Sequence, residues 1–107
     1  MITTVAIAAA SNGDNTLVAA QAGFAIRVVS FILTFSAAVN AKFTDGAGGT
    51  NLCGLLYGIG TGPPPIVAPI AGPNARGYFQ TTKGNALILN LSGAVPVGGE
   101  VVYELVG

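Results

Sequence analysis

The residues that could perform chemistry are few in this sequence, and no spacing among them builds an active site. There is no histidine, which removes the commonest general base and the commonest metal ligand. Glu100 and Glu104 would have to act as a pair, yet the rise of a strand would hold their side chains about 13 Å apart. The sequence therefore predicts a protein that is not an enzyme, with no catalytic residue and no cofactor.

The two aspartates lie in glycine-rich turns, where a carboxylate commonly hydrogen-bonds to nearby backbone. We expect this structural role for Asp14 and Asp45. A calcium site that combines Asp45 with Thr50 and Asn51 is a weaker alternative, because one carboxylate is too few for a good site. Cys53 is the only cysteine, which excludes an internal disulfide and a cysteine-based metal site, and we interpret it as a small buried hydrophobic residue. No metal site is expected.

Charge is scarce along the whole chain. Eight of the 107 residues are charged and the net charge is zero, whereas about 25–35% of the surface residues of a small domain are usually charged. Hydrophobic residues make up 51% of the sequence, and the mean hydropathy is +0.69. The basic residues are few and scattered, so binding to nucleic acid is not expected. Part of the apolar surface must instead contact sister subunits, a foreign partner or a bilayer.

One stretch, residues 17–39, is long enough to span a membrane as a helix. It contains Gln21, Gly23 and Arg27, and it is rich in the β-branched and aromatic residues that favour strands. We therefore expect no membrane span. The first residues carry no basic cluster of the kind that begins a secretory signal, which favours a protein made in the cytoplasm and kept there until assembly.

Short β-branched or aromatic segments alternate with turns rich in glycine and proline, a pattern typical of sandwiches and barrels. The expected strands cover residues 2–8, 16–20, 26–37, 39–44, 52–57, 77–82, 86–92 and 100–106. Eight or nine short antiparallel strands predict a single all-β domain over residues 1–107, a β-sandwich or jelly-roll-like fold.

The C-terminal third has the clearest period of two. Leu87, Leu89 and Leu91 occupy alternate positions, so they should lie on one buried face. Residues 100–106 alternate in the same way. We expect these two segments to form an antiparallel pair.

The longest expected strand, residues 26–37, contains a conflict. Alternation places Val29 on the same face as Phe31, and strict parity would place Arg27 there too, where a charge is costly. A β-bulge near Val28 would turn the arginine outward.

Five prolines fall within residues 63–73, and each lacks the hydrogen-bond donor that a central strand needs. An extended, polyproline-like segment at an edge or on the surface is expected. It serves either as a stiff loop or as an arm that lies on a neighbouring subunit. This segment and the first strand supply the candidate partner contacts, namely Ile2, Val5, Pro63, Pro64, Pro65, Ile66 and Pro69.

Several segments resemble small virion proteins of tailed bacteriophages. The resemblance is carried by residues 11–20 with Gly23 and residues 26–28, by residues 77–81, and by residues 84–92 and 97–103. Proteins of this type are often capsid decoration or cement proteins, which are β-sandwiches, commonly trimeric, seated on the outer shell at local threefold axes. The proline-rich segment is not part of the pattern.

The resemblance implies a structural protein of the virion that binds the major capsid protein on the outer capsid surface. It would be made in the bacterial host's cytoplasm and would stabilise the shell as a ring-shaped homo-oligomer, most simply a trimer. Such a closed ring also agrees with the shortage of charge, because it buries an apolar patch on every subunit. Two alternatives remain: another virion component, such as a head-fibre base or a tail protein, and a carbohydrate-binding or membrane-associated β module.

Overall fold

The computed structural model describes residues 2–59, 66–68 and 79–107, and every regular element in this part of the chain is a β-strand. The strands are β1 (Ile2–Ala9), β2 (Gly13–Val18), β3 (Ala25–Phe35), β4 (Ala38–Asp45), β5 (Thr50–Asn51), β6 (Leu56–Ile59), β7 (Ile66–Ala68), β8 (Phe79–Gln80), β9 (Leu87–Leu91) and β10 (Val97–Val106). Within the same ranges, no helix has the length and apolarity needed to cross a membrane.

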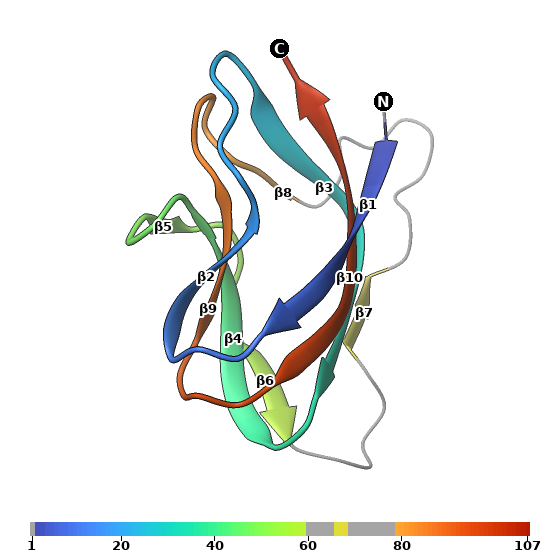
Figure 1. The fold of residues 1–107 in the computed structure, drawn as a ribbon, viewed down its shortest axis with the longest axis vertical. Helices are drawn as coiled ribbons and strands as arrows, with labels where there is room; N and C mark the ends of the chain where they lie inside the picture. The colour runs from blue at the N-terminus through green and yellow to red at the C-terminus, as the bar shows by residue number, and fades with distance from the viewer. Residues whose placement is uncertain (1, 60–65, 69–78) are drawn as a thin grey trace.

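The strands form two antiparallel sheets that pack face to face (Figure 1). Sheet A has the order β1-β10-β3, and both β7 and β8 pair with β3. Sheet B has the order β2-β9-β4, and both β5 and β6 pair with β4. Because β7 and β8 pair with successive parts of β3, they occupy one position in sheet A, and β5 and β6 share one position in sheet B.

The described strands therefore fill eight positions, four in each sheet. Along the sequence it passes back and forth between the sheets, with β1, β3 and β10 in sheet A and β2, β4 and β9 in sheet B. This connectivity is that of a jelly roll, which is built from two Greek keys. The expected all-β, jelly-roll-like sandwich is confirmed.

Alternate residues of the central strands point between the sheets and form the core. Leu87, Leu89 and Leu91 are at most 1% exposed, as their spacing predicts, and they line the inner face of sheet B. Leu33 and Val101 are fully buried on the inner face of sheet A. The two sheets are thus held together by one continuous apolar layer.

Aromatic rings join the sheets near the middle of this layer. The centroids of the Phe31 and Phe43 rings, from β3 and β4, are 5.0 Å apart. Phe79 of β8 lies 5.1 Å from Phe43 in the same measure. The rings are tilted by 58° and 41°, and aromatic pairs at such separations add about 0.5–1.5 kcal/mol to the stabilisation from the area that they bury.

The expected pairing of the last two strands is wrong. β9 pairs with β2 and β4, whereas β10 pairs with β1 and β3, so the two strands belong to opposite sheets. The connection between them, residues 92–96, crosses from sheet B to sheet A at the lower end of Figure 1. Both strands still place their alternate apolar residues in the same core. Alternation alone does not distinguish two strands that face each other from two that lie side by side.

The bulge expected in the longest strand is confirmed, and the extra residue is Val29. Val28 and Ser30, on either side of it, pair with consecutive residues of β10. The extra residue changes the parity of β3, so Arg27 points away from the core while Val28 is fully buried. Val29 itself is not part of the core cluster, in contrast to its expected place beside Phe31.

Strand β2 begins at Gly13, three residues earlier than expected, because a side chain makes the preceding turn. The Asn15 amide donates to the carbonyl of Ser11 at 2.9 Å, and its Oδ1 accepts the Ser11 N–H at 3.2 Å. The backbone of residues 13–15 is therefore free to pair with β9.

Residues 52–55 leave the sheet, although a strand was expected over residues 52–57. β5 ends opposite Thr44 and β6 begins opposite Ala41, so four residues stand opposite two of β4. Only the Leu52 N–H still donates to the Phe43 carbonyl, at 2.8 Å. The strand expected over residues 77–82 is limited to Phe79–Gln80, and residues 77–78 lie outside the described ranges.

We expect the substitution Leu89→Ala to lower the free energy of unfolding by about 2–5 kcal/mol, because it opens a cavity in a fully buried site. Leu55→Ala is the matched control, since Leu55 is 47% exposed, and it should change stability by less than about 1 kcal/mol. Urea denaturation of both variants measures the difference. Equal effects of the two substitutions would contradict the assigned core.

Candidate interaction surface

The carboxylate of Asp14 fastens a loop of sheet B. Its Oδ1 accepts a hydrogen bond from the Asn90 amide at 2.7 Å, and its Oδ2 accepts the Gly48 N–H at 2.8 Å. These bonds, the one from Asn90 above all, hold the pKa of Asp14 below its usual value. The turn of residues 46–49 is thereby tied to β2.

The carboxylate of Asp45 has a similar task at the other end of the same turn. It accepts hydrogen bonds from the Thr82 N–H at 2.8 Å, from the Thr82 hydroxyl at 2.6 Å and from the Asn85 amide at 3.1 Å. Burial on its own raises the pKa of Asp45, but the three hydrogen bonds together outweigh it, so the pKa lies below its usual value. Side-chain-to-backbone bonding was expected for both aspartates and is confirmed.

The calcium alternative receives no support from this arrangement. Both oxygens of Asp45 already accept hydrogen bonds, and Thr50 and Asn51 are exposed on a two-residue strand. Within the described residues, no three histidine, cysteine or carboxylate side chains gather in a way that could hold a metal ion. Cys53 is partly buried against the core, close to its expected place.

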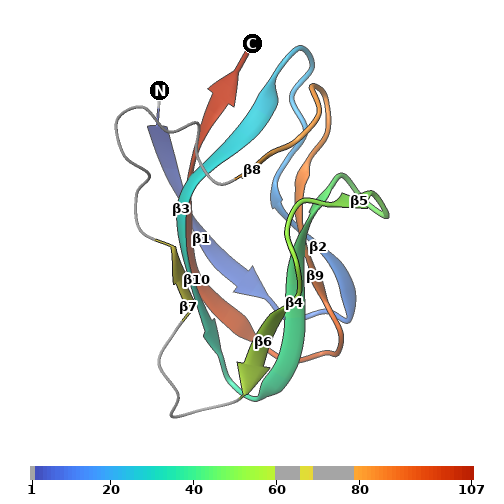
Figure 2. The ribbon, with the colours of Figure 1, turned by 180° about the vertical axis from the view of Figure 1, so that it is seen from behind.

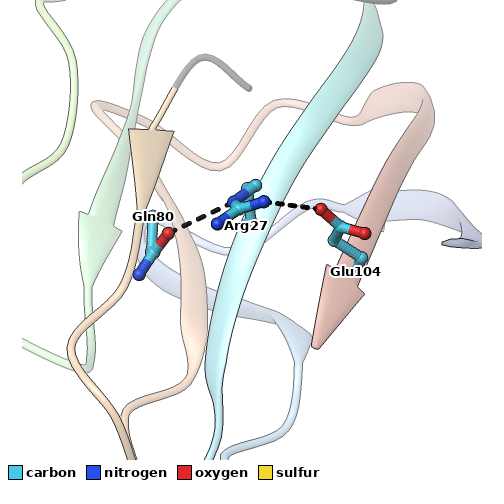
Figure 3. Close-up of polar contacts among 3 residues, drawn as sticks. All are labelled: Arg27, Gln80 and Glu104. Atoms are coloured by element: carbon cyan, nitrogen blue, oxygen red, sulfur yellow. Dashed lines mark hydrogen bonds and ion pairs between the residues drawn. The ribbon is translucent and has the colours of Figure 1, made fainter. Parts of the chain in front are cut away.

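Arg27, the cation of sheet A's outer face, is paired on both sides (Figure 3). Its Nη1 donates to Oε1 of Glu104 on β10 at 2.8 Å, and its Nε donates to Oε1 of Gln80 on β8 at 3.3 Å. The side chains of Arg27 and Glu104 are 24% and 28% exposed, so the ion pair contributes no more than about 1 kcal/mol. Its main effect is to leave this row of the sheet without net charge.

The remaining outward positions of sheet A are small and mostly uncharged. Register and alternation place three rows there, Thr4–Val102–Ser30, Ala6–Glu100–Ile32 and Ala8–Gly98–Thr34. Glu100 is the charged residue in these rows and is exposed. Apart from Glu100, the exposed residues of these rows have short side chains, which lets another protein surface approach the sheet closely.

The last of these rows forms the floor of an open groove with a volume of about 470 Å³. Gly98 leaves the floor of the groove without a side chain. A Cβ at this position would lie 3.1 Å from the Thr34 hydroxyl oxygen, so a larger residue would crowd Thr34. At the rim, the Ser36 hydroxyl donates to the Pro96 carbonyl at 2.9 Å, so that polar group is satisfied within the chain. A groove with this small apolar lining and no convergent polar groups suits an apolar side chain.

The predicted contact residues fall at the edges of sheet A, as far as the structure describes them. Ile2 is 59% exposed at the start of the edge strand β1. Val5 packs against the core, so it offers a partner mainly its backbone. Ile66 begins β7, at the opposite edge, and the other four residues, Pro63, Pro64, Pro65 and Pro69, lie outside the described ranges.

Among the described residues, three other large apolar side chains are exposed, and no sequence pattern predicts their exposure. Phe24 and Leu55 are 41% and 47% exposed, and both lie in connections where no period reveals which way a side chain points. Tyr57 is 66% exposed. Alternation in β6 does not reveal that its side chain points outward, because Leu56 and Gly58 on one face and Tyr57 and Ile59 on the other leave neither face polar.

Comparison with known proteins adds no relative, because no family model, curated protein or solved structure matches this chain.

The lowered pKa values of Asp14 and Asp45 predict a loss of stability in acid. The unfolded carboxylates have a pKa near 3.8 and the folded ones lie below it, so the unfolded state takes up protons first as the pH falls. The stabilisation is complete above about pH 5 and is lost as the pH falls through the folded pKa values. We expect the melting temperature to be level from pH 7 to pH 5 and to fall below about pH 4.

The variants Asp45→Asn and Asp14→Asn/Asp45→Asn test the cause of this acid sensitivity. Each substitution should lower the melting temperature at pH 7 and flatten the decline in acid, the double variant more than the single one. A decline as steep as that of the unchanged protein in the double variant would show that other groups are responsible.

Proposed function

We propose that this protein is a structural subunit of a virus particle, and specifically a capsid decoration protein of a tailed bacteriophage that binds the outer surface of the shell. The observation that carries the proposal is a jelly-roll sandwich with few charged groups, of which Asp14, Asp45, Arg27 and Glu104 are engaged within the chain. Jelly rolls serve in viral capsids, in lectins and in cupins. The sequence has no histidine to form the metal site of a cupin.

The scarcity of charge supports a role in assembly. Asp14 and Asp45 accept hydrogen bonds from neighbouring loops, and Arg27 pairs with Glu104. The outward rows of sheet A then consist mainly of alanine, threonine, valine and glycine, with Ser30 and Ile32 on β3 and Glu100 as the one charged residue. Surfaces of this kind are stable in water when another protein covers them.

A decoration protein strengthens a shell by bridging neighbouring capsid subunits, so that the contacts must be lost before the shell opens. On this chain the bridge would consist of apolar burial, at about 25 cal/mol per Å² of apolar area, and of backbone hydrogen bonds. An oligomer binds the major capsid protein at several points at once. Individually weak contacts then give high avidity through effective concentration.

A carbohydrate-binding module is the second candidate, and the exposure of Tyr57 is the observation that favours it. Its ring lies on the outer face of sheet B, opposite Asn40 in the register, and combines an apolar face with a hydroxyl. Binding on a glycan array that is lost in the Tyr57→Ala variant would favour this candidate over the capsid role.

The capsid role predicts that attachment to the shell resists salt. Washing particles that carry the protein in about 1 M NaCl reduces the screening length to about 3 Å, which weakens exposed ion pairs far more than apolar contacts. We expect most of the protein to stay bound, as measured by gel densitometry of the pelleted particles. Release of most of it in salt would show that ionic contacts hold it, and would contradict this mechanism.

A further inference from the structure

Strand β1 forms a free edge of sheet A that carries none of the features by which edge strands avoid pairing. Its eight residues contain no charge, no proline and no glycine, and its register with β10 runs from Ile2 to Ala9 without a bulge. In the described part of the chain it pairs with β10 alone. Figure 1 looks onto this edge, with β1 in front of β10, and Figure 2 shows β1 at the back.

The other described edges are protected or short. β2 carries Asp14, and its register with β9 shifts between Thr16 and Val18. The strands at the far edges, β5, β6, β7 and β8, have two to four residues each. Charges, bulges and shortness are the usual means of keeping an edge from pairing with another chain. β1 is therefore the described edge most suited to adding a strand.

An exposed apolar side chain and an apolar groove lie at opposite ends of this edge, on the same face of sheet A. Ile2 is 59% exposed, and its register with Glu104, the partner of Arg27, places it on the outer face. At the other end, Ala8 and Gly98 form the floor of the groove on that face. If β1 of a second copy ran antiparallel to β1, the Ile2 side chain of each copy would lie beside the groove of the other.

We propose that β1 pairs antiparallel with β1 of a second copy of this chain about a two-fold axis, joining the two A sheets into one continuous sheet. The axis passes through Val5, which stands opposite its own copy. Residues of equal parity then meet on the same face, with Ile2 opposite Ala8 and Thr4 opposite Ala6. No charge lies on either strand, so no like charges oppose each other.

This contact closes after two copies, so it differs from the trimeric ring that the resemblance implies. A two-fold interface of this kind uses the same patch on both subunits. It is a property of the chain in solution and does not depend on the role proposed for it on a shell. Light scattering after gel filtration, in reducing buffer because Cys53 is free, should give twice the chain mass of 10.6 kDa at about 100 μM.

Charge substitutions test the register. Thr4 and Ala6 are exposed, so Thr4→Asp/Ala6→Asp and Thr4→Lys/Ala6→Lys should both keep the far-ultraviolet circular dichroism of the unchanged protein. Each places like charges opposite each other in two positions and should weaken dimerisation at least tenfold. An equimolar mixture of the two variants should restore the dimer. Thr16→Asp, on the β2 edge of sheet B, is the control and should leave the dimer unchanged.

A second pair of variants tests the contact between Ile2 and the groove of the other copy. Ile2→Ala removes two apolar side chains from the interface of a dimer and should raise its dissociation constant at least tenfold. Phe24→Ala is the control. It removes an exposed side chain from the connection between β2 and β3, and it should leave the dissociation constant unchanged.

Three results would overturn the proposal: a wild-type monomer at 100 μM, an oligomer of any size that survives both charge variants, and a mixture that stays monomeric. The first result, combined with loss of particle binding in the Asp variant, would mean that a strand of the shell covers β1. Loss of the dimer contact leaves the salt-resistance test of the capsid role unaffected, so the two proposals fail separately.

Discussion

The structure depends on one apolar layer shared by two sheets. Leu89 from sheet B and Val101 from sheet A are both fully buried in it, and the rings of Phe31 and Phe43 bridge it. Because successive side chains of a strand point to opposite faces, every residue committed to this layer sends its neighbours outward. The core thus determines which residues face away from it as well as which hold the fold together.

The consequence is a surface with few charges, and four of the eight charged residues are engaged within the chain. The hydrogen bonds that fix the 46–49 turn engage Asp14 and Asp45, and the bulge at Val29 brings Arg27 outward, where Glu104 neutralises it. Each of these charges stabilises a loop or a row of the sheet, and little of it remains to repel another protein. A sheet face of small residues and an unprotected edge strand lie side by side on this molecule, and both favour association.

Alternation in the sequence predicted the buried leucines of β9 and, through the conflict at Arg27, the bulge in β3. It did not predict that β9 and β10 lie in opposite sheets, because period two records which side of a strand is apolar and not which strand is its neighbour. The early start of β2 depends on the Asn15 side chain, a local hydrogen bond that competes with the backbone turn. Ile2 could be named as a candidate partner contact because it lies in an apolar first strand. The groove at Gly98 could not, since three strands distant in sequence build it.

The central claim is that β1, at the edge of sheet A, pairs with β1 of a second copy of this chain in solution. Hydrogen exchange of the β1 amides, followed by mass spectrometry at about 1 μM and 100 μM, tests it most directly. Amides that point away from β10 should exchange quickly in the dilute sample and more slowly in the concentrated one, while the amides of β2 and β9 keep their rates. Equal exchange of the β1 amides at both concentrations would contradict the claim.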